Sequence, residues 1–244
     1  MKILFISAHP DDLELCIGEF IYRLNKIHDI LIVSATRGEW GTVNNKLKGK
    51  WLAKIRENEL KDAASVHGVG PKKVKFFNYV DGGIKFQDQI INELKKFILE
   101  NKFDAIFAPE YYYTYYFHPD HVNLGKIFLY NIFKLNKHSR PRLFFYHSIY
   151  NNRFIKVNMR RTQKAVMKHK TQILIIGFFI ALRPIINLFN GILSKKLPFA
   201  EAVREVDFEN ELQLKLPFKY KILFNALKIG KIFERPWTAE EDQL

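Results

Sequence analysis

The chain has 244 residues, of which 48% are hydrophobic and 15% aromatic, enough for an α/β domain of ordinary size with a large core. Its formal net charge is +14, and no Asp or Glu occurs from residue 121 to residue 200, where fifteen Lys and Arg stand. Such a block attracts polyanions, although a compositional bias toward Lys accounts for part of the total charge. No helix-turn-helix, RNP or zinc-finger pattern is present, so specific nucleic-acid recognition is not expected.

Strand and helix patterns alternate through residues 1–150. Continuous apolar strands with helices between them are typical of a parallel sheet that is covered on both faces. We therefore expect an α/β fold with a Rossmann-like, mostly parallel sheet as the catalytic core. The expected strands are 2–8, 29–35, 74–77, 104–108 and 142–149, the expected helices are 13–26, 52–66, 90–99 and 121–135, and 37–50 is an expected loop.

Residues 151–244 are expected to form a helical and strand extension that completes the same domain. Residues 153–170 are basic, with a helix expected from Met159. Residues 173–182 are almost pure hydrocarbon, too few to span a bilayer, and we expect Arg183-Pro184 to interrupt them. The polar residues that follow recur at helical spacing, at Arg183, Asn187, Asn190 and Ser194. The amphipathic segment 173–193 is either a core or dimer-interface helix or an interfacial membrane helix.

Two polar clusters follow expected strands. His9 and the adjacent Asp11 and Asp12 stand after the first strand, and His118 and His121 follow the fourth. The carboxyl edge of an open α/β sheet is where ligands bind.

His9, Asp12 and His121 offer two nitrogens and one oxygen to a metal, a set that suits zinc and leaves a position for water. Asp11 would then be free to act as a general base. His118 could stabilise the oxyanion and protonate the leaving amine. Either cluster alone could instead be a helix cap, with Asp11, Asp12 or Asp120 binding free N–H groups.

The order of several motifs resembles the LmbE-like de-N-acetylase family, which includes the N-acetylglucosaminyl-phosphatidylinositol deacetylases. The resemblance extends through most of the chain. Two departures leave every expected ligand in place: Glu19 follows Gly18, and Phe117 precedes His118. The matching segments are 8–14, 36–42, Arg56 with Glu59, Asp81-Gly82, 118–121, 169–172 and 200–204.

The resemblance implies roles for particular residues. It makes His9, Asp12 and His121 zinc ligands, Asp11 the general base and His118 the oxyanion or acid histidine. Arg56, Tyr116 and Arg37 are the substrate-binding residues expected from it. Arg56 could instead pair with Glu59 one helical turn away, and Tyr116 belongs to a tyrosine-rich stretch that could be plain surface packing.

The expected function is zinc-dependent hydrolysis of the acetamide of an N-acetylglucosamine-type sugar, in a glycoconjugate or lipid-linked glycan precursor. An amide hydrolase with a non-sugar substrate, and a basic membrane-binding protein with a vestigial site, are the alternatives. The single Cys16 and a strand beginning at residue 2, which leaves no room for a secretory signal, predict a cytoplasmic protein. Segment 173–193 and the acid-free block predict peripheral contact with an anionic membrane, and a homo-oligomer stays open.

Overall fold

A computed structural model describes residues 1–211 of the chain. Within these residues, one seven-stranded sheet has the strand order β3-β2-β1-β4-β5-β7-β6. The first five strands are parallel, whereas β7 is antiparallel to both β5 and β6. The strands are β1 (Lys2–Ser7), β2 (Asp29–Thr36), β3 (Val74–Tyr79), β4 (Ala105–Pro109), β5 (Arg142–Tyr146), β6 (Arg153–Lys156) and β7 (Ala200–Glu205).

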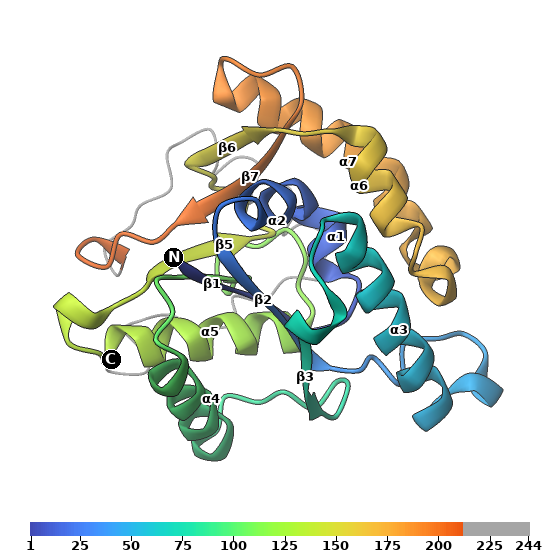
Figure 1. Cartoon of the computed structure of the whole chain (residues 1–244), viewed down its shortest axis with the longest axis horizontal. Coiled ribbons are helices and arrows are strands. Elements are labelled where there is room, and N and C mark those ends of the chain that lie inside the picture. Colours follow the sequence, from blue (N-terminus) through green and yellow to red (C-terminus); the bar gives the residue numbers. More distant parts are fainter. Residues whose placement is uncertain (212–244) are drawn as a thin grey trace.

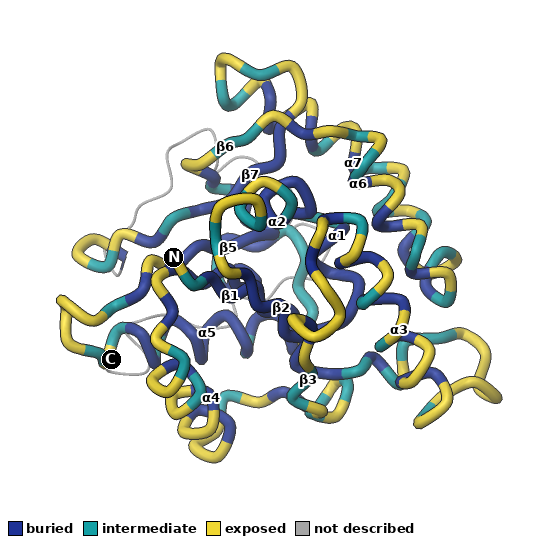
Figure 2. Tube along the Cα trace, viewed as in Figure 1, coloured by how far each residue is buried: buried dark blue, intermediate teal, exposed yellow. Residues whose placement is uncertain are grey.

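Helices cover both faces of this sheet (Figure 1). Side chains alternate along β1, so that Leu4 and Ile6 pack with α4 and α5 while Ile3 and Phe5 pack with α1, α2 and α3. The central strands are buried along their length, as Figure 2 shows. The mostly parallel α/β fold expected from the sequence is confirmed. The helices are α1 (Asp12–Cys16), α2 (Gly18–Asn25), α3 (Lys50–Val66), α4 (Asp88–Asn101), α5 (Pro119–Phe133), α6 (Met159–Val166) and α7 (Ile173–Ser194).

The first expected helix, 13–26, is two helices in the structure, α1 and α2. The break falls at Ile17, whose φ of −137° and ψ of 28° lie outside the helical region. Gly18 begins α2 where a β-carbon would stand 2.8 Å from the His67 ring. The apolar spacing of the segment is helical on both sides of the break, so the pattern does not mark the corner.

The C-terminal part of the described chain adds two strands and two helices to the same sheet. The expectation of a helix from Met159 is confirmed. Arg183-Pro184 interrupts the apolar run of the sequence but not the helix, because α7 continues through Pro184 without a break. The part of the expected extension that falls on 212–244 lies outside the described residues.

The strand order reverses direction between β1 and β4. From β1 the chain moves outward to β2 and β3, and then returns to place β4 on the other side of β1. The loops after β1 and β4 therefore diverge, and open α/β sheets bind ligands in the crevice that this leaves. Both polar clusters of the sequence follow these two strands.

Candidate active site

The three expected metal ligands meet at this crevice. The Nδ1 atom of His9 lies 3.0 Å from Nε2 of His121. That Nε2 atom is 3.1 Å from Oδ2 of Asp12, and His9 Nδ1 is 3.7 Å from Asp12 Oδ1. All three side chains are buried. His9 and Asp12 come from the loop after β1 and the start of α1, and His121 from the first turn of α5.

These distances fit a metal ion. Ligand atoms about 2.0–2.2 Å from a tetrahedral zinc lie roughly 3.3–3.6 Å from one another, close to the separations seen here. Two imidazole nitrogens facing each other at 3.0 Å can share one proton at most, so a cation between them satisfies both lone pairs. His9, Asp12 and His121 are thus able to hold a metal ion.

Two further carboxylates surround the other nitrogen of His9. Its Nε2 atom lies 3.1 Å from Asp81 Oδ1 and 3.3 Å from Asp120 Oδ2. Burial alone would lower the pKa of His9, but Asp12, Asp120 and Asp81 together hold it well above the usual range. Three carboxylates around one imidazole make this crevice strongly favourable for positive charge.

Sequence reasoning did not assign Asp81 and Asp120 to His9. The Asp120 carboxylate accepts hydrogen bonds from the backbone N–H groups of Gly82 and Ile84, at 2.7 and 3.0 Å. It therefore ties the loop after β3 to α5, and the alternative that it caps its own helix is wrong. The Asp81-Gly82 motif, already visible in the sequence, was the signal that this loop belongs to the site.

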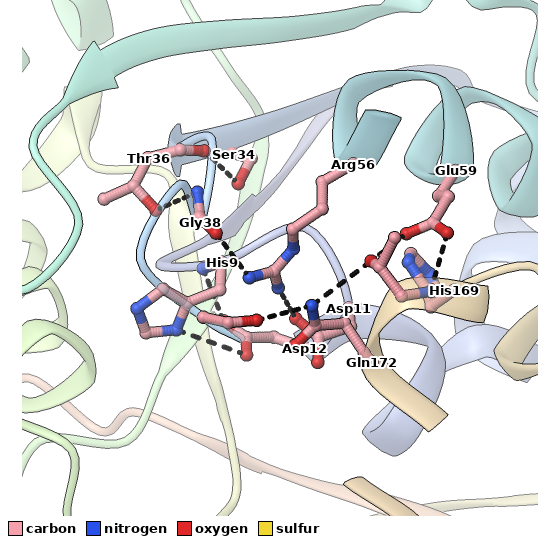
Figure 3. Close-up of polar contacts among 12 residues, drawn as sticks. His9, Asp11, Asp12, Ser34, Thr36, Gly38, Arg56, Glu59, His169 and Gln172 are labelled. Carbon is pink, nitrogen blue, oxygen red and sulfur yellow. Dashed lines mark hydrogen bonds and ion pairs between the residues drawn. The ribbon is translucent and has the colours of Figure 1, made fainter. Parts of the chain in front are cut away.

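Asp11 points away from Asp12 and toward α3 (Figure 3). Its Oδ1 atom accepts a hydrogen bond from Arg56 Nη2 at 2.5 Å, and Arg56 Nη1 donates to the Gly38 carbonyl at 2.8 Å. Asp11 occupies the N-cap position of α1 but makes no side-chain cap hydrogen bond there, so the cap alternative is wrong for this residue.

The alternative pairing of Arg56 with Glu59 is wrong as well. Glu59 accepts hydrogen bonds from the N–H and hydroxyl groups of Thr171, at 2.8 and 2.7 Å. Arg56 lines the pocket, as the prediction of a substrate contact requires, but both of its terminal nitrogens already serve Asp11 and Gly38.

His118 stands at the other wall, with its ring centre 4.6 Å from that of His9. Its Nδ1 atom accepts a hydrogen bond from the Asp120 N–H at 3.3 Å, which makes His118 the N-cap of α5. Burial, together with the nearby His9 and His121, lowers the pKa of His118. The neutral ring, with Nδ1 occupied as acceptor, carries its proton on Nε2 and can donate it to a ligand.

The polar atoms open into a cavity of about 390 Å³. Tyr116 lines it, with its ring centre 4.9 Å from that of His121, and burial raises the pKa of the Tyr116 phenol. Of the tyrosines before it, Tyr111 and Tyr113 are buried in the core, so only the end of that stretch belongs to the pocket. Arg37 is not among the lining residues: its guanidinium pairs with Glu57 at 3.0 Å on a partly exposed surface.

The far wall of the cavity comes from α7. Arg183, Asn187 and Asn190 are buried and line it, together with Asn151 from the loop after β5. Arg183 Nη2 donates to Glu201 at 2.9 Å, whereas its Nε and Nη1 atoms have no hydrogen-bond partner in the described residues. Sequence reasoning noted the polar stripe of α7 without assigning it to the site. Its helical spacing beside an apolar stripe was the available signal.

His169 and Gln172, from the motif at 169–172, connect the segment before α7 to the walls of the site. His169 Nε2 lies 3.2 Å from Glu14 Oε2, and both side chains are completely buried. Gln172 donates to the Gly41 carbonyl at 2.8 Å, which fastens the loop after β2 to the start of α7. Figure 3 shows Gln172 and His169 beside Glu59, next to the Asp11 and Arg56 pair.

Known proteins share both the sequence and the fold. The chain is 27% identical over 188 residues to the diacetylchitobiose deacetylase of Thermococcus kodakarensis, with 70% of each protein covered. The N,N'-diacetylchitobiose deacetylase from Pyrococcus horikoshii, solved with an inhibitor, matches with a TM-score of 0.78 and 25% identity, over 89% of this chain and 87% of that one.

The fold also resembles that of an enzyme with a different reaction. The 4-carboxy-2-hydroxymuconate hydratase from Pseudomonas putida matches with a TM-score of 0.69 at 14% identity, over 84% of this chain and 96% of that one. This likeness shows the fold alone, because one fold can host unrelated chemistries.

Family membership therefore rests on the sequence. A family model described as PIG-L, GlcNAc-PI de-N-acetylase, matches residues 4–131, more than half of the chain. The matched range contains most of β1, all of β2 to β4 and most of α5, and with them every residue of the two polar clusters. The chain belongs to the PIG-L family of de-N-acetylases.

Proposed function

We propose that this protein is a zinc-dependent deacetylase that hydrolyses the acetamide of an N-acetylglucosamine-type sugar, giving the free amine and acetate. One observation carries the proposal: His9, Asp12 and His121 converge within 4.8 Å of one another, beside a separately held Asp11, at the switch point of the sheet. A ligand set plus a free carboxylate is what metal-assisted hydrolysis requires. Membership of the PIG-L family and the two diacetylchitobiose deacetylase relatives support the class of substrate.

Each residue of the site has a separate role in the proposed reaction. Zinc held by His9, Asp12 and His121 supplies Lewis acidity toward water and the amide carbonyl. Asp11 accepts the proton of the attacking water, and its pairing with Arg56 fixes the direction of the carboxylate. His118 donates a hydrogen bond from its Nε2–H to the carbonyl oxygen as negative charge develops there. The proton taken up by Asp11 then passes to the amine nitrogen as the C–N bond breaks. Tyr116 closes the wall beside His121.

Acetate release from N-acetylated chitooligosaccharides tests this proposal. We expect the purified protein to release acetate, a chelator to abolish the release, and Zn²⁺ to restore it. His121→Ala should lose both bound zinc, by elemental analysis, and activity. An unchelated protein that holds no divalent metal would contradict the metal site. Equal acetate release from N-acetyl amines without a sugar would contradict the substrate class.

A further inference from the structure

Helix α7 has a polar face that is turned toward the protein and an apolar face that is turned outward, the reverse of an ordinary surface helix. The inward face carries the buried Arg183, Asn187 and Asn190 of the pocket wall. The outward face is apolar and exposed: Leu174 is 88% exposed, Phe178 68% and Ile192 66%. Surface helices of soluble proteins turn their apolar face inward, so this arrangement requires a partner for the outward face.

The outward residues form one continuous stripe. They recur at steps of four and three positions, which places them on one side of the helix. Residues 1–211 leave this stripe exposed, and only 22% of the most apolar stretch of Lys170–Ser194 is buried. The stripe consists of Leu174, Phe178, Ala181, Ile185, Leu188 and Ile192.

By length and composition this helix could cross a membrane, but its inward face argues against a span. Arg183 is buried and ion-paired with Glu201 on β7, and a spanning helix would have to carry that charge into hydrocarbon. A helix that keeps one face on its own domain and offers the other to the interface lies in the plane of a membrane.

The basic residues at both ends of the stripe indicate which kind of surface it binds. Exposed Lys164 and Lys170 precede α7, exposed Lys195 and Lys196 follow it, and no acidic residue occurs between residues 121 and 200. An anionic leaflet complements such a cluster at both ends of the stripe. Two copies of the chain packed through the same stripe would bring like charges together, so a lipid surface fits better than a second copy.

Partly exposed lining residues at the start of the same helix mark the mouth of the pocket. Ile175 and Phe179 line the pocket, as does Trp40 from the loop that Gln172 fastens to α7. Trp40 is 53% exposed, and tryptophan is enriched at the headgroup level of membranes. A sugar carried on a lipid could therefore enter this mouth without leaving the leaflet.

We propose that the outward stripe of α7 docks the protein on an anionic lipid leaflet and that its acetylated sugar substrate is carried on a lipid. The second half of this proposal rests on the deacetylase function proposed above, whereas the docking does not. The leaflet is the inner face of the membrane if the protein is cytoplasmic, as its sequence leads us to expect.

Vesicle flotation of the full chain tests the docking. We expect it to float with phosphatidylcholine vesicles that contain phosphatidylglycerol and much less with phosphatidylcholine alone. Raising the ionic strength, which shortens the Debye length from about 30 Å at 0.01 M to about 8 Å at 0.15 M, should weaken binding. The double variant Leu174→Ser/Phe178→Ser should lose at least about tenfold in the bound fraction, since it removes two large apolar contacts.

A matched control is Leu99→Ser. Leu99 is an exposed residue of α4, and α4 packs on the opposite face of the sheet. This control should float like the parent. Circular dichroism shows whether the double variant is folded. Failure of the parent to float with anionic vesicles at low salt would overturn the docking. So would a dimer in sedimentation velocity that the double variant dissociates, because the stripe would then belong to a second copy.

Two substrates separate this proposal from the proposed function. The double variant should deacetylate a soluble N-acetylated chitooligosaccharide at the parental rate, since neither changed residue lines the pocket. Its rate on a lipid-linked N-acetylglucosamine in anionic vesicles should fall in parallel with its binding. Equal rates for parent and double variant on the lipid-linked sugar would overturn the lipid-carried substrate. Flotation without any deacetylation would overturn the proposed function and leave the docking intact.

Discussion

The two neighbouring aspartates after β1 are turned in opposite directions by different partners. Asp12 lies against His9 and His121, whereas Asp11 is bound to Arg56 from α3. Asp11 is the N-cap of α1 and Asp12 its first residue, and adjacent side chains at the start of a helix point in different directions. The buried guanidinium fixes the direction that Asp11 takes. One carboxylate is thereby available to a metal and the other to a proton.

Replacing the expected base tests this separation. Asp11→Asn should stay folded and keep its zinc, because the amide oxygen still accepts the Arg56 hydrogen bond, although loss of the buried ion pair should lower its stability. Its turnover number should fall by about 10²–10⁴-fold, the usual worth of a general base. Acetate release and elemental analysis measure the two effects. Asp11→Ala is a poorer choice, since it removes the hydrogen-bond acceptor of the buried Arg56 as well as its ion-pair partner. A near-normal turnover number for Asp11→Asn would show that Asp11 is not the base.

His67 makes the fold sensitive to acid. Burial, with smaller contributions from the charges of Arg183 and Arg161, lowers the pKa of His67 to about 3. In the unfolded chain His67 is protonated near pH 6.5, whereas in the folded chain it is protonated only near pH 3. The stability due to neutral His67 is therefore complete above pH 6.5 and is lost as the pH falls toward 3.

His67→Phe should remove this dependence. Between pH 6 and pH 4 the free energy of unfolding should fall less steeply, by up to about 1.4 kcal/mol per pH unit. Urea denaturation at a series of pH values measures the slope. The exposed His138, changed in the same way, should leave the slope unchanged. Identical slopes for the parent and His67→Phe would contradict the assignment.

At the scale of elements, the site depends on how closely α5 approaches β4. Gly125 lies one turn after His121, where a β-carbon would stand 2.2 Å from the Pro109 carbonyl oxygen. Gly125→Ala should destabilise the protein by about 1–3 kcal/mol through overpacking and move the first turn of α5. We expect a lower midpoint of thermal unfolding and weaker zinc binding.

Gly177 on α7 is the matched control, because a β-carbon there meets no atom of residues 1–211 within 4 Å. Gly177→Ala should stabilise the protein by about 0.4–1 kcal/mol, since alanine restricts the unfolded chain and favours helix. A Gly125→Ala protein as stable as the parent would show that α5 can withdraw from β4 at little cost.

At the scale of the molecule, metal binding would join two distant parts of the chain. Asp12 and His121 belong to α1 and α5, on opposite faces of the sheet. A metal held only by the folded chain at about 100 times its Kd adds about 2.7 kcal/mol to stability. Chelation should therefore lower the midpoint of thermal unfolding by roughly 5–10 °C. In His121→Ala the midpoint should not respond to the chelator. A parental midpoint that chelation leaves unchanged would contradict a metal site in the folded protein.

The sequence by itself determined the alternation of strands and helices and the sheet edge where the two polar clusters meet. These are properties of local periodicity and of chain order, since parallel strands bring their carboxyl ends to one edge. The order of the motifs also determined the family. It did not show the corner at Ile17, because a helical apolar pattern continues on both sides of it.

Only the tertiary structure decided which polar groups pair. Asp11 meets Arg56 across 45 positions, and Asp120 faces His9 across the gap between β1 and α5. Such contacts depend on how α3 and α5 pack on the sheet, which no local pattern encodes. The same is true of α7: its two stripes were visible in the sequence, but only packing on β7 turned the polar stripe inward and left the apolar stripe exposed.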